Sequence, residues 1–498
     1  MTRSAQCSPA DGSRPISSPP ALPPLRKKWG GRSALRSTDR AGSQQLYPAP
    51  PLAARAQRSS RTRAGSPRAA GVAATPRKAW LDRSELRLAR PSDHGTLGHV
   101  KIDRLRLIAP GLLLAATGVG AGDLMTGTLA GTELGTAVLW AALAGAFLKF
   151  VLSEGVARWQ LASGTTLLEG WHHKLGAWIR WPFLIYLSLF SVIVGRALAN
   201  ACGVAGTALL PIGSTETSVM VWAALHSIAG LLIVLRGSFR AFESLMSVLI
   251  GLMFLTVIGT TAMIAPPAGE IAAGLIPSIP AGGTSWILAV LGGVGGTVTL
   301  LSYGYWIAEQ DRRGPEMLST CRIDLAVGNG VTAVFGLCVI IIGSQIEVQG
   351  SGAALATQMA ERLQEAVGPA GKWVFLVGFW GAVFSSLLGV WQSIPYMFAD
   401  FLRLTTGGSG DLRSSKPYRF CVVLVAIVPL FLLNAPVRQI QLTYGIVGAC
   451  FLPLLALTLL LLNGRTSWVG RRLRNPLWIS IALGTCVAFF AALPLLDR

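Results

Sequence analysis

The chain has 498 residues, of which 52% are hydrophobic and only 13% are charged, and its mean hydropathy is +0.53. Soluble domains carry about twice this charged fraction, so the composition argues against a soluble enzyme and predicts an integral membrane protein. The formal net charge of +20 does not indicate nucleic-acid binding, because residues 1–99 hold 18 Lys/Arg against 5 Asp/Glu and the remaining residues only 25 against 18.

Residues 1–100 are rich in Arg, Ser, Pro and Ala without any period, as in "RSSRTRAGSPRAAGVAATPRKAW". Such a segment cannot bury a core and is predicted to be a disordered basic tail. It has no apolar h-region of a signal peptide. Three interpretations stay open: a cytoplasmic tail on anionic lipid, a transit-like leader, or a gene-model artefact with a true start near Val100. Residues 101–498 form the predicted transmembrane transporter domain.

Apolar stretches long enough to cross a bilayer, which takes about 20 residues, recur along the rest of the chain. Eleven are predicted, all as helices, so the fold class is an all-α integral membrane protein: 106–133, 137–157, 182–210, 218–235, 243–265, 285–308, 325–345, 372–399, 419–434, 440–462 and 476–495.

The loop charges predict the orientation of these spans. With the N-terminus in the cytoplasm, the segments on that side hold 19 Lys/Arg and the opposite side four, while Lys149 and Arg196 lie within spans. We therefore expect a cytoplasmic N-terminus, an extracytoplasmic C-terminus and a plasma membrane of the bacterial type. Membrane lipid is then the expected partner, nucleic acid is not, and the protein is expected to be a monomer.

The first span contains "ATGVGAGDLMTG", residues 116–127, in which four glycines surround one carboxylate. Glycine permits conformations that end a helix, and an opened turn presents backbone carbonyls to a cation. Asp123 would add a full negative charge, and an ionisable group inside the membrane indicates a functional site. The expected metal ligands here are Asp123 and the backbone of Gly120 and Ala121.

The sixth span carries a second glycine cluster in "LAVLGGVGGTVTLLSYGYW", residues 288–306. Interrupted segments at matching positions of two halves predict a 5+5 inverted repeat with broken helices 1 and 6 and a site at the midplane. Helix eleven is then an addition. Thr297 and Thr299 are the expected hydroxyl ligands. The alternative is that the glycines only allow close helix packing.

Three stretches together resemble the Nramp (natural resistance-associated macrophage protein) metal transporters. They are "IAPGLLLAATGVGAGDLMTGTLAGTELGTAVLW", "GFWGAVFSSLLGVWQSIPYMFADFLR" and "IQLTYGIVGACFLPLLALTLLLLNGR", similar to the first, eighth and tenth helices of that family. The resemblance covers residues 104–465. It implies a LeuT-like fold and proton-coupled uptake of divalent metals such as manganese and iron.

The family motifs at the metal site are not conserved in this chain. Where the family has Asp-Pro-Gly-Asn this chain has "GAGD", and where it has Met-Pro-His this chain has Thr299, Leu300 and Leu301. A helix-six histidine aligns with Trp306, a helix-three carboxylate with Asn200 and a helix-ten glutamine with Gly445. The sulfur ligand is absent, and oxygen ligands favour Mg²⁺ or Mn²⁺.

Other polar and aromatic residues of the spans are candidates for gating or coupling. For each of them the alternative is an ordinary role as a solvent-exposed or packing residue. Arg196, if buried, would need a partner such as Asp123 or Glu133. The candidates are Glu133, Glu154 (with Arg158 at i+4), Arg196, Asn200, Ser302, Tyr303, Trp306 and Glu309.

The predicted function is import of divalent cations of the Mn²⁺, Mg²⁺ and Fe²⁺ class by a secondary transporter that works by alternating access, with proton coupling left open. The alternative is a transporter of a small organic solute on the same scaffold, for which the aromatic run at Tyr303, Tyr305 and Trp306 is the best hint. An enzyme is not expected, because no catalytic constellation occurs. The seven cysteines and five histidines lack metal-ligand spacing, so no cofactor is expected.

Overall fold

A computed structural model of the chain describes residues 109–118, 120, 122–236, 239–264, 266–346, 354–408 and 410–496. The predictions for residues 1–100 lie outside these residues. Within them the structure is helical, and no strand occurs in the part of the chain that is described. This agrees with the all-α class read from the composition.

The helices follow one another in chain order with short connections. The first half of the described chain contains α2 Ala109–Gly118, the π-helix η1 Gly122–Gly127, α3 Thr128–Leu134, the 3₁₀ turn η2 Gly135–Val138, α4 Leu139–Ser163, α5 Leu167–Gly170, η3 Trp171–Leu175, α6 Ala177–Leu209, α7 Thr215–Arg236, α8 Phe239–Ile264 and α9 Ala268–Gly274. The second half contains α10 Thr284–Gly293, η4 Val298–Leu301, α11 Ser302–Glu309, η5 Pro315–Met317, α12 Leu318–Ser344, α13 Leu355–Val367, α14 Pro369–Thr406, α15 Lys416–Ile427, η6 Val428–Leu432, α16 Val437–Ala449, α17 Phe451–Asn463, α18 Thr466–Leu473 and α19 Leu477–Leu496.

Where the structure describes them, the eleven predicted ranges fall mainly on helical segments. By length and composition, seven helices among the described residues suffice to cross a membrane, or eight if the bent pair Phe254–Ile264 and Ala268–Gly274 counts as one span. The shorter apolar helix Leu477–Ala492 is not included in that number. The membrane character of the chain is therefore established, while the count of eleven crossings and the 5+5 repeat stay predictions.

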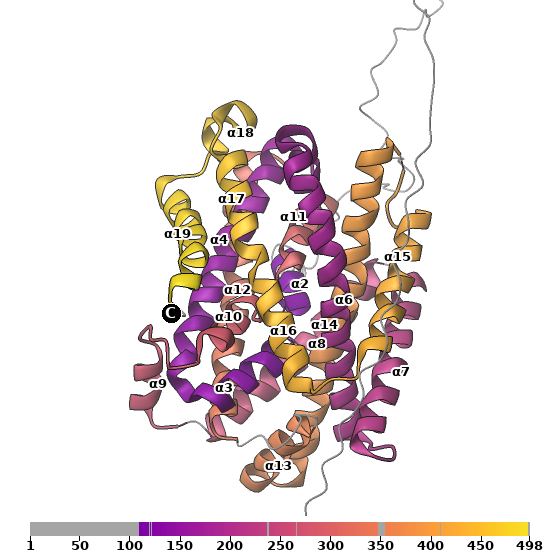
Figure 1. Ribbon diagram of the computed structural model, residues 1–498, viewed down its shortest axis with the longest axis vertical. Helices are drawn as coiled ribbons and strands as arrows, with labels where there is room; N and C mark the ends of the chain where they lie inside the picture. Colours follow the sequence, from indigo (N-terminus) through magenta and orange to yellow (C-terminus); the bar gives the residue numbers. More distant parts are fainter. Residues whose placement is uncertain are drawn as a thin grey trace, which may run out of the picture. The chain divides into compact units, whose positions relative to one another are not determined.

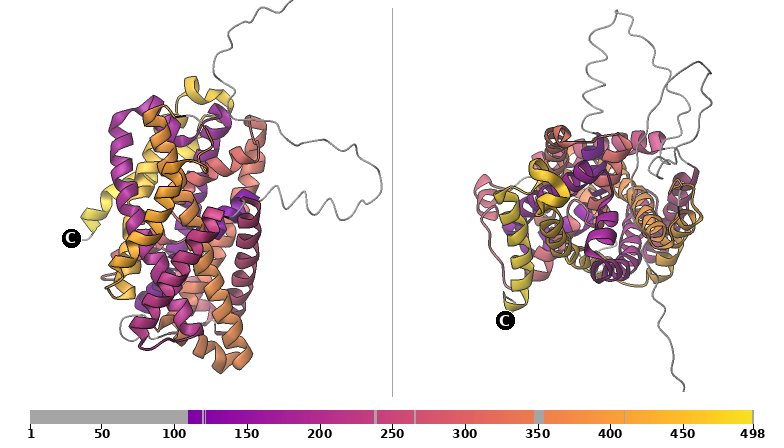
Figure 2. Two further views of the ribbon diagram at one scale, coloured as in Figure 1. Left: turned by 90° about the vertical axis from the view of Figure 1, so that its right-hand side faces the viewer. Right: turned by 90° about the horizontal axis from the view of Figure 1, so that it is seen from above.

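The interrupted helices lie in the middle of the bundle. In Figure 1, α2, α10 and α11 lie centrally, α18 lies at the upper end, and α9 and α13 lie at the lower end. Helices α10 and α16 pack on one another, α12 packs on α2, α3 and α4, and α14 packs on α6 and α8. Figure 2 shows the long helices running side by side in similar directions, as bilayer crossing requires.

Large apolar side chains cover the outward faces of the helices. Phe147, Ile185, Phe420 and Phe431 are 56%, 70%, 65% and 77% exposed. Such exposure would be costly in water, where burial of a large apolar side chain is worth about 1.5–3 kcal/mol. In a bilayer these faces contact lipid tails, so the same surface is compatible with the membrane.

Helix ends carry capping groups that satisfy their free backbone atoms. Thr166 and Glu169 form a capping box at the start of α5, with both hydrogen bonds at 3.2 Å. Gly164 and Gly407 adopt left-handed conformations at the ends of α4 and α14. These caps define where the long helices end and the connecting loops begin.

Candidate functional site

The first span is interrupted at the glycine cluster, as the sequence predicts. Helix α2 ends at Gly118, and the chain becomes helical again in η1 at Gly122. Between them, the Gly120 carbonyl accepts a hydrogen bond of 2.7 Å from the Leu124 amide. Ala121, a predicted metal ligand, lies outside the described residues. The interruption leaves backbone groups of α2 and η1 unpaired by regular helix bonds, which is where a polar partner can enter.

The sixth span is interrupted at its own glycine cluster. Helix α10 ends at Gly293, and Gly295 and Gly296 have φ values of 77° and 71° before η4 begins at Val298. This left-handed conformation is strained for residues with a side chain and routine for glycine. The two successive glycines therefore turn the chain away from the α10 axis.

Asp123 connects the two interruptions. Its side chain is completely buried. The Gly295 amide donates to Oδ1 at 3.1 Å and to Oδ2 at 3.3 Å, and the Gly120 amide donates to Oδ2 at 3.3 Å. The carboxylate thus ties the opened turn of span one to the opened turn of span six. Two N–H donors compensate part of the cost of burying its charge.

Lys149 of α4 lies on the other side of the same junction, and sequence reasoning gave it no role. Its side chain is completely buried, and Nζ donates to the Gly292 carbonyl at 3.2 Å. That carbonyl belongs to the C-terminal end of α10, the negative end of the helix dipole. A lone lysine in the apolar run "AFLKFV" was the sequence signal that could have identified it.

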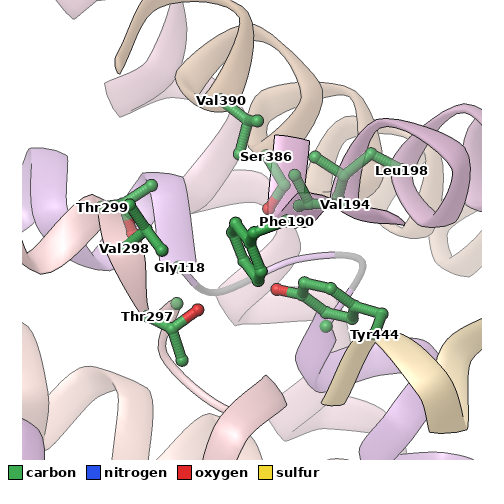
Figure 3. Close-up of a pocket in the computed structure, with 12 residues that line it drawn as sticks. Gly118, Phe190, Val194, Leu198, Thr297, Val298, Thr299, Ser386, Val390 and Tyr444 are labelled. Carbon is green, nitrogen blue, oxygen red and sulfur yellow. The ribbon is translucent and has the colours of Figure 1, made fainter. Parts of the chain in front are cut away.

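A small cavity opens beside the junction (Figure 3). Its lining comes from α2, η1, α6, η4, α14, α16 and the opened turn of span six, and every lining residue is buried: Gly118, Gly122, Phe190, Val194, Leu198, Gly296, Thr297, Val298, Thr299, Ser386, Val390 and Tyr444. The centre of a water-sized sphere can occupy about 10 Å³ of it, which is roughly the space of one water molecule. The cavity thus has room for a single small ion or water molecule in this conformation.

Three hydroxyl groups of the cavity lining have no hydrogen-bond partner among the residues that the structure describes. They are Thr297 Oγ1, Thr299 Oγ1 and Ser386 Oγ, all buried. Figure 3 shows the Thr297 and Tyr444 hydroxyls pointing toward the centre of the cavity beside the Phe190 ring. The structure places Thr297 and Thr299, the two predicted hydroxyl ligands, in this lining, and it adds Ser386, which sequence reasoning missed because it lies on the distant helix α14.

The donor set of this region consists of oxygen atoms. Among the described residues, no three His, Cys, Asp or Glu side chains gather closely enough to hold a metal ion. Asp123 is not part of the cavity lining, although Gly118 and Gly122 on either side of its opened turn are. A cation here would be coordinated by hydroxyl and carbonyl oxygens with one carboxylate close by, a set typical of hard cations.

A second small pocket is lined mainly by α11 and α14. Its lining unites three of the predicted gating residues, Ser302, Trp306 and Glu309, with Tyr305, Gln392, Ser393, Tyr396 and Arg413. Ser302 Oγ, Gln392 Oε1 and Ser393 Oγ are buried and have no hydrogen-bond partner in the described part of the chain. Ser302 begins α11 three residues after Thr299, so both pockets contain buried oxygens that lack a partner among the described residues.

Two ion pairs join helices in this part of the bundle, and one of them belongs to the lining of the second pocket. In the second pocket, Arg413 contacts Glu309 at 3.2 Å and stacks over Tyr396 at 5.7 Å. Elsewhere, Glu133 of α3 contacts Arg438 of α16 at 2.6 Å, and Arg438 stacks over Trp286 of α10 at 5.6 Å.

The aromatic run of span six is engaged in structural hydrogen bonds. Tyr303 donates to Asp324 at 2.9 Å, and Asp324 also pairs with Arg312 at 2.9 Å. Tyr305 donates to Asp400 at 2.7 Å, and Asp400 pairs with Arg403 at 2.6 Å. The two tyrosines thereby fix α11 to α12 and α14, and neither lines the central cavity. Sequence reasoning did not single out Asp324 or Asp400.

The remaining predicted residues lie away from the cavity. Glu154 forms the expected pair with Arg158, at 2.6 Å, and also binds Arg322 at 3.0 Å. Arg196 is only half-buried and forms no ion pair within the described part of the chain, so the condition for its pairing with Asp123 or Glu133 is not met. Asn200 is buried with Oδ1 unpartnered.

Comparison with known proteins gives one family match. The profile of the family described as "Natural resistance-associated macrophage protein-like" matches residues 111–496. A search of curated protein sequences gave no match.

Solved structures share the fold at low sequence identity. The manganese transporter of Eremococcus coleocola, in a mutant form, is 17% identical and superposes with a TM-score of 0.62 over 82% of this chain and 88% of that chain. The same transporter with an aromatic bis-isothiourea substituted compound is 18% identical, with a TM-score of 0.61 over the same shares of the two chains, 82% and 88%. MhsT in complex with L-phenylalanine is 17% identical and gives 0.52 over 79% and 97%.

Proposed function

This chain belongs to the natural resistance-associated macrophage protein-like family, and on that premise we propose that it is a membrane transporter that carries a divalent metal cation by alternating access. The cation binds in the small cavity between the two interrupted helices. It is a member of the Mn²⁺, Mg²⁺ and Fe²⁺ class, in agreement with the manganese transporter whose fold is similar.

The observation that carries this proposal is the set of three buried, unpaired hydroxyls around the cavity, Thr297, Thr299 and Ser386. An unsatisfied buried polar group costs about 1–3 kcal/mol. A bound cation offers each hydroxyl oxygen a partner, and release of the cation restores the unfavourable state. The cavity is therefore suited to a transient ligand with positive charge.

Asp123 supplies the negative charge of the site. Its two oxygens accept three backbone N–H contacts, and an ionised carboxylate has roughly four lone-pair positions, so capacity for a cation remains. The carbonyls of Gly120 and Ala121 complete the proposed ligand set. Because the cavity has the space of roughly one water, the ion sheds most of its hydration in this conformation, which Mn²⁺ tolerates better than Mg²⁺.

These two ion pairs are the proposed gates. Glu133–Arg438 closes the side predicted to be extracytoplasmic, and Glu309–Arg413 closes the cytoplasmic side. Ser302, Gln392 and Ser393 form the inner part of the route, where their unpaired polar groups replace water ligands of the moving ion. Alternating access then requires that one ion pair opens while the other stays closed.

The test is uptake of Mn²⁺, Fe²⁺, Mg²⁺ and Ca²⁺ into proteoliposomes that contain the purified protein, with internal pH recorded. Thr297→Val and Ser386→Ala each remove one proposed ligand. We expect each to lower uptake by about tenfold, equivalent to about 1.4 kcal/mol. Thr458→Val is the matched control, because Thr458 is also a buried threonine but bonds only to the Leu455 carbonyl of its own helix.

The second candidate is transport of a small organic solute, which the apolar wall of Phe190, Val194 and Leu198 favours. If no metal enters with folded wild-type protein, or if Thr297→Val and Ser386→Ala transport metal like Thr458→Val, the cation proposal fails and solute uptake becomes the assay. The pH recording decides whether protons accompany the cargo.

A further inference from the structure

Among the buried charged side chains that the structure describes, two at the junction lack the direct ion pair that all the others have. Within the described ranges, the buried charged side chains are Asp123, Lys149, Glu154, Arg158, Arg312, Asp324 and Asp400. The last five all have an opposite charge within 4 Å. Asp123 and Lys149 have none in the described structure, although both side chains lie against the same opened turn at Gly295.

Gly295 separates the two side chains. Its amide donates to Asp123 at 3.1 Å, and a Cβ built on its Cα would lie 3.4 Å from Lys149 Cδ. Lys149 Nζ binds the Gly292 carbonyl at the end of α10. One opened turn therefore has the carboxylate on one side and the ammonium on the other, and the net charge of the junction is zero.

We propose that Lys149 is a tethered cation built into the transport site, which balances Asp123 when no cargo is bound and so lets the empty transporter switch between its two faces. This rests on the proposed function. Lys149 is a positioning residue that acts through Asp123 and the α10 terminus, and it does not touch the cargo.

The physical reason lies in the transport cycle. After release of cargo, the site must move between the two closed ends with Asp123 still buried, and an unbalanced charge within the membrane is costly. A cation bound from solution could compensate the charge of Asp123 in the empty carrier. Here the ammonium occupies the negative end of α10, where such a cation would be attracted. In the loaded carrier the positive charge of the cargo compensates Asp123, so this half of the cycle depends less on Lys149.

The experiment separates the two halves of the cycle in proteoliposomes with radioactive Mn²⁺. Entry into vesicles that hold unlabelled Mn²⁺ measures exchange, which needs only the loaded carrier. Entry into vesicles without Mn²⁺ measures net uptake, which also needs return of the empty carrier. For Lys149→Met we expect the ratio of net uptake to exchange to fall by about tenfold, because the empty site then carries an unbalanced carboxylate.

Two further variants make the test specific. Lys149→Arg keeps the charge and is expected to restore the ratio. Lys372→Met, the same substitution at the first turn of α14, is expected to keep the wild-type ratio. An unchanged ratio in Lys149→Met overturns the proposal, and so does a parallel loss of net uptake and exchange in folded protein, because that is the result of a structural role. If wild type itself shows no exchange, the proposed function fails instead.

A measurement of thermal unfolding covers the case in which Lys149→Met does not survive purification. Lys149→Met and Asp123→Asn each leave one buried charge unbalanced, whereas the double variant leaves none. We expect the double variant to unfold at a higher temperature than either single variant. Additive losses would contradict the charge balance between Asp123 and Lys149.

Discussion

Asp123 is held by backbone amides of two different interrupted helices, so one side chain couples two segments that are 172 positions apart. At the residue scale this explains why a carboxylate is tolerated inside an apolar span. The amides of Gly120 and Gly295 stabilise its charge, and the glycines themselves allow the backbone to come close enough to donate. The same geometry keeps the carboxylate next to the cavity without making it part of the wall.

Gly295 provides the residue-scale prediction. Its φ of 77° is strained for alanine, and an added Cβ would lie 2.7 Å from Thr332 Cγ2, closer than real contacts allow. We expect Gly295→Ala to destabilise the protein by about 1–3 kcal/mol and to reduce transport, because the turn that binds Asp123 must shift. Thermal unfolding and Mn²⁺ uptake measure both effects.

The control for this substitution is Gly484→Ala in α19, where an added Cβ meets nothing within 4 Å. This variant is expected to retain wild-type stability or gain a little from the better helix propensity of alanine. Equal stability of Gly295→Ala and Gly484→Ala would show that the left-handed turn is not required.

At the scale of elements, the interrupted helices are held against their neighbours by side-chain contacts. Tyr303 and Tyr305 fix α11 through Asp324 and Asp400, and Arg438 joins α16 to α3 and α10. Close backbone approach joins α10 and α16 as well, since an added Cβ at Gly445 would lie 2.7 Å from the Ala289 Cα. The close contact leaves no space for a side chain at Gly445, the position where the family resemblance implies a glutamine.

The element-scale prediction concerns the two proposed gates. Arg438→Gln removes the ion pair with Glu133, and Arg413→Gln removes the pair with Glu309. We expect Arg438→Gln to open the extracytoplasmic side and Arg413→Gln the cytoplasmic side. Accessibility is measured with Val194→Cys, a cavity residue, in a background without native cysteines. A membrane-impermeant thiol reagent added outside intact cells should label it faster in Arg438→Gln and more slowly in Arg413→Gln.

Arg419→Gln on the exposed surface of α15 is the matched control and should label like the parent protein. Labelling that changes in the same direction in both gate variants would contradict the assignment, because loosening of the whole bundle has that effect. We expect the labelling rate to change by several-fold. Each ion pair is partly exposed and is therefore worth at most about 1 kcal/mol.

At the scale of the whole molecule, the balance between Asp123 and Lys149 determines how the membrane potential acts. A core without net charge moves only the charge of its cargo. For a divalent cation, an inside-negative potential of 100 mV favours entry by about 4.6 kcal/mol, twice the value for a single charge. Coupling to protons is therefore not required by energetics.

We accordingly expect Mn²⁺ uptake into proteoliposomes to accelerate when a potassium gradient with valinomycin makes the interior negative, and to slow when it makes the interior positive. Protein-free vesicles correct for leak. If the uptake rate does not depend on the sign of the potential, another ion compensates the charge of the metal. A change of internal pH in step with metal entry would identify that ion as the proton.

Much of the architecture could be predicted from the sequence, because local composition decides it. Apolar runs of bilayer length form helices in lipid, so the predicted ranges fall mainly on helices where the structure describes them. Glycine clusters predicted both interruptions for the same local reason, and the carboxylate of the first cluster accepts hydrogen bonds from both. Family membership followed from segment similarity over most of the chain.

Only the tertiary structure decided what the site is made of. Ser386 and Tyr444 reach the cavity from α14 and α16, far along the chain from Asp123, and no local pattern distinguishes them from packing residues. The roles of Tyr303 and Tyr305 depend on Asp324 and Asp400 across helix contacts. Lys149 is recognisable in the sequence as a charge in an apolar run, but its proposed role depends on its contacts with the end of α10 and on the position of Asp123. Helix formation is local, whereas the balance of buried charges is set by which helices pack together.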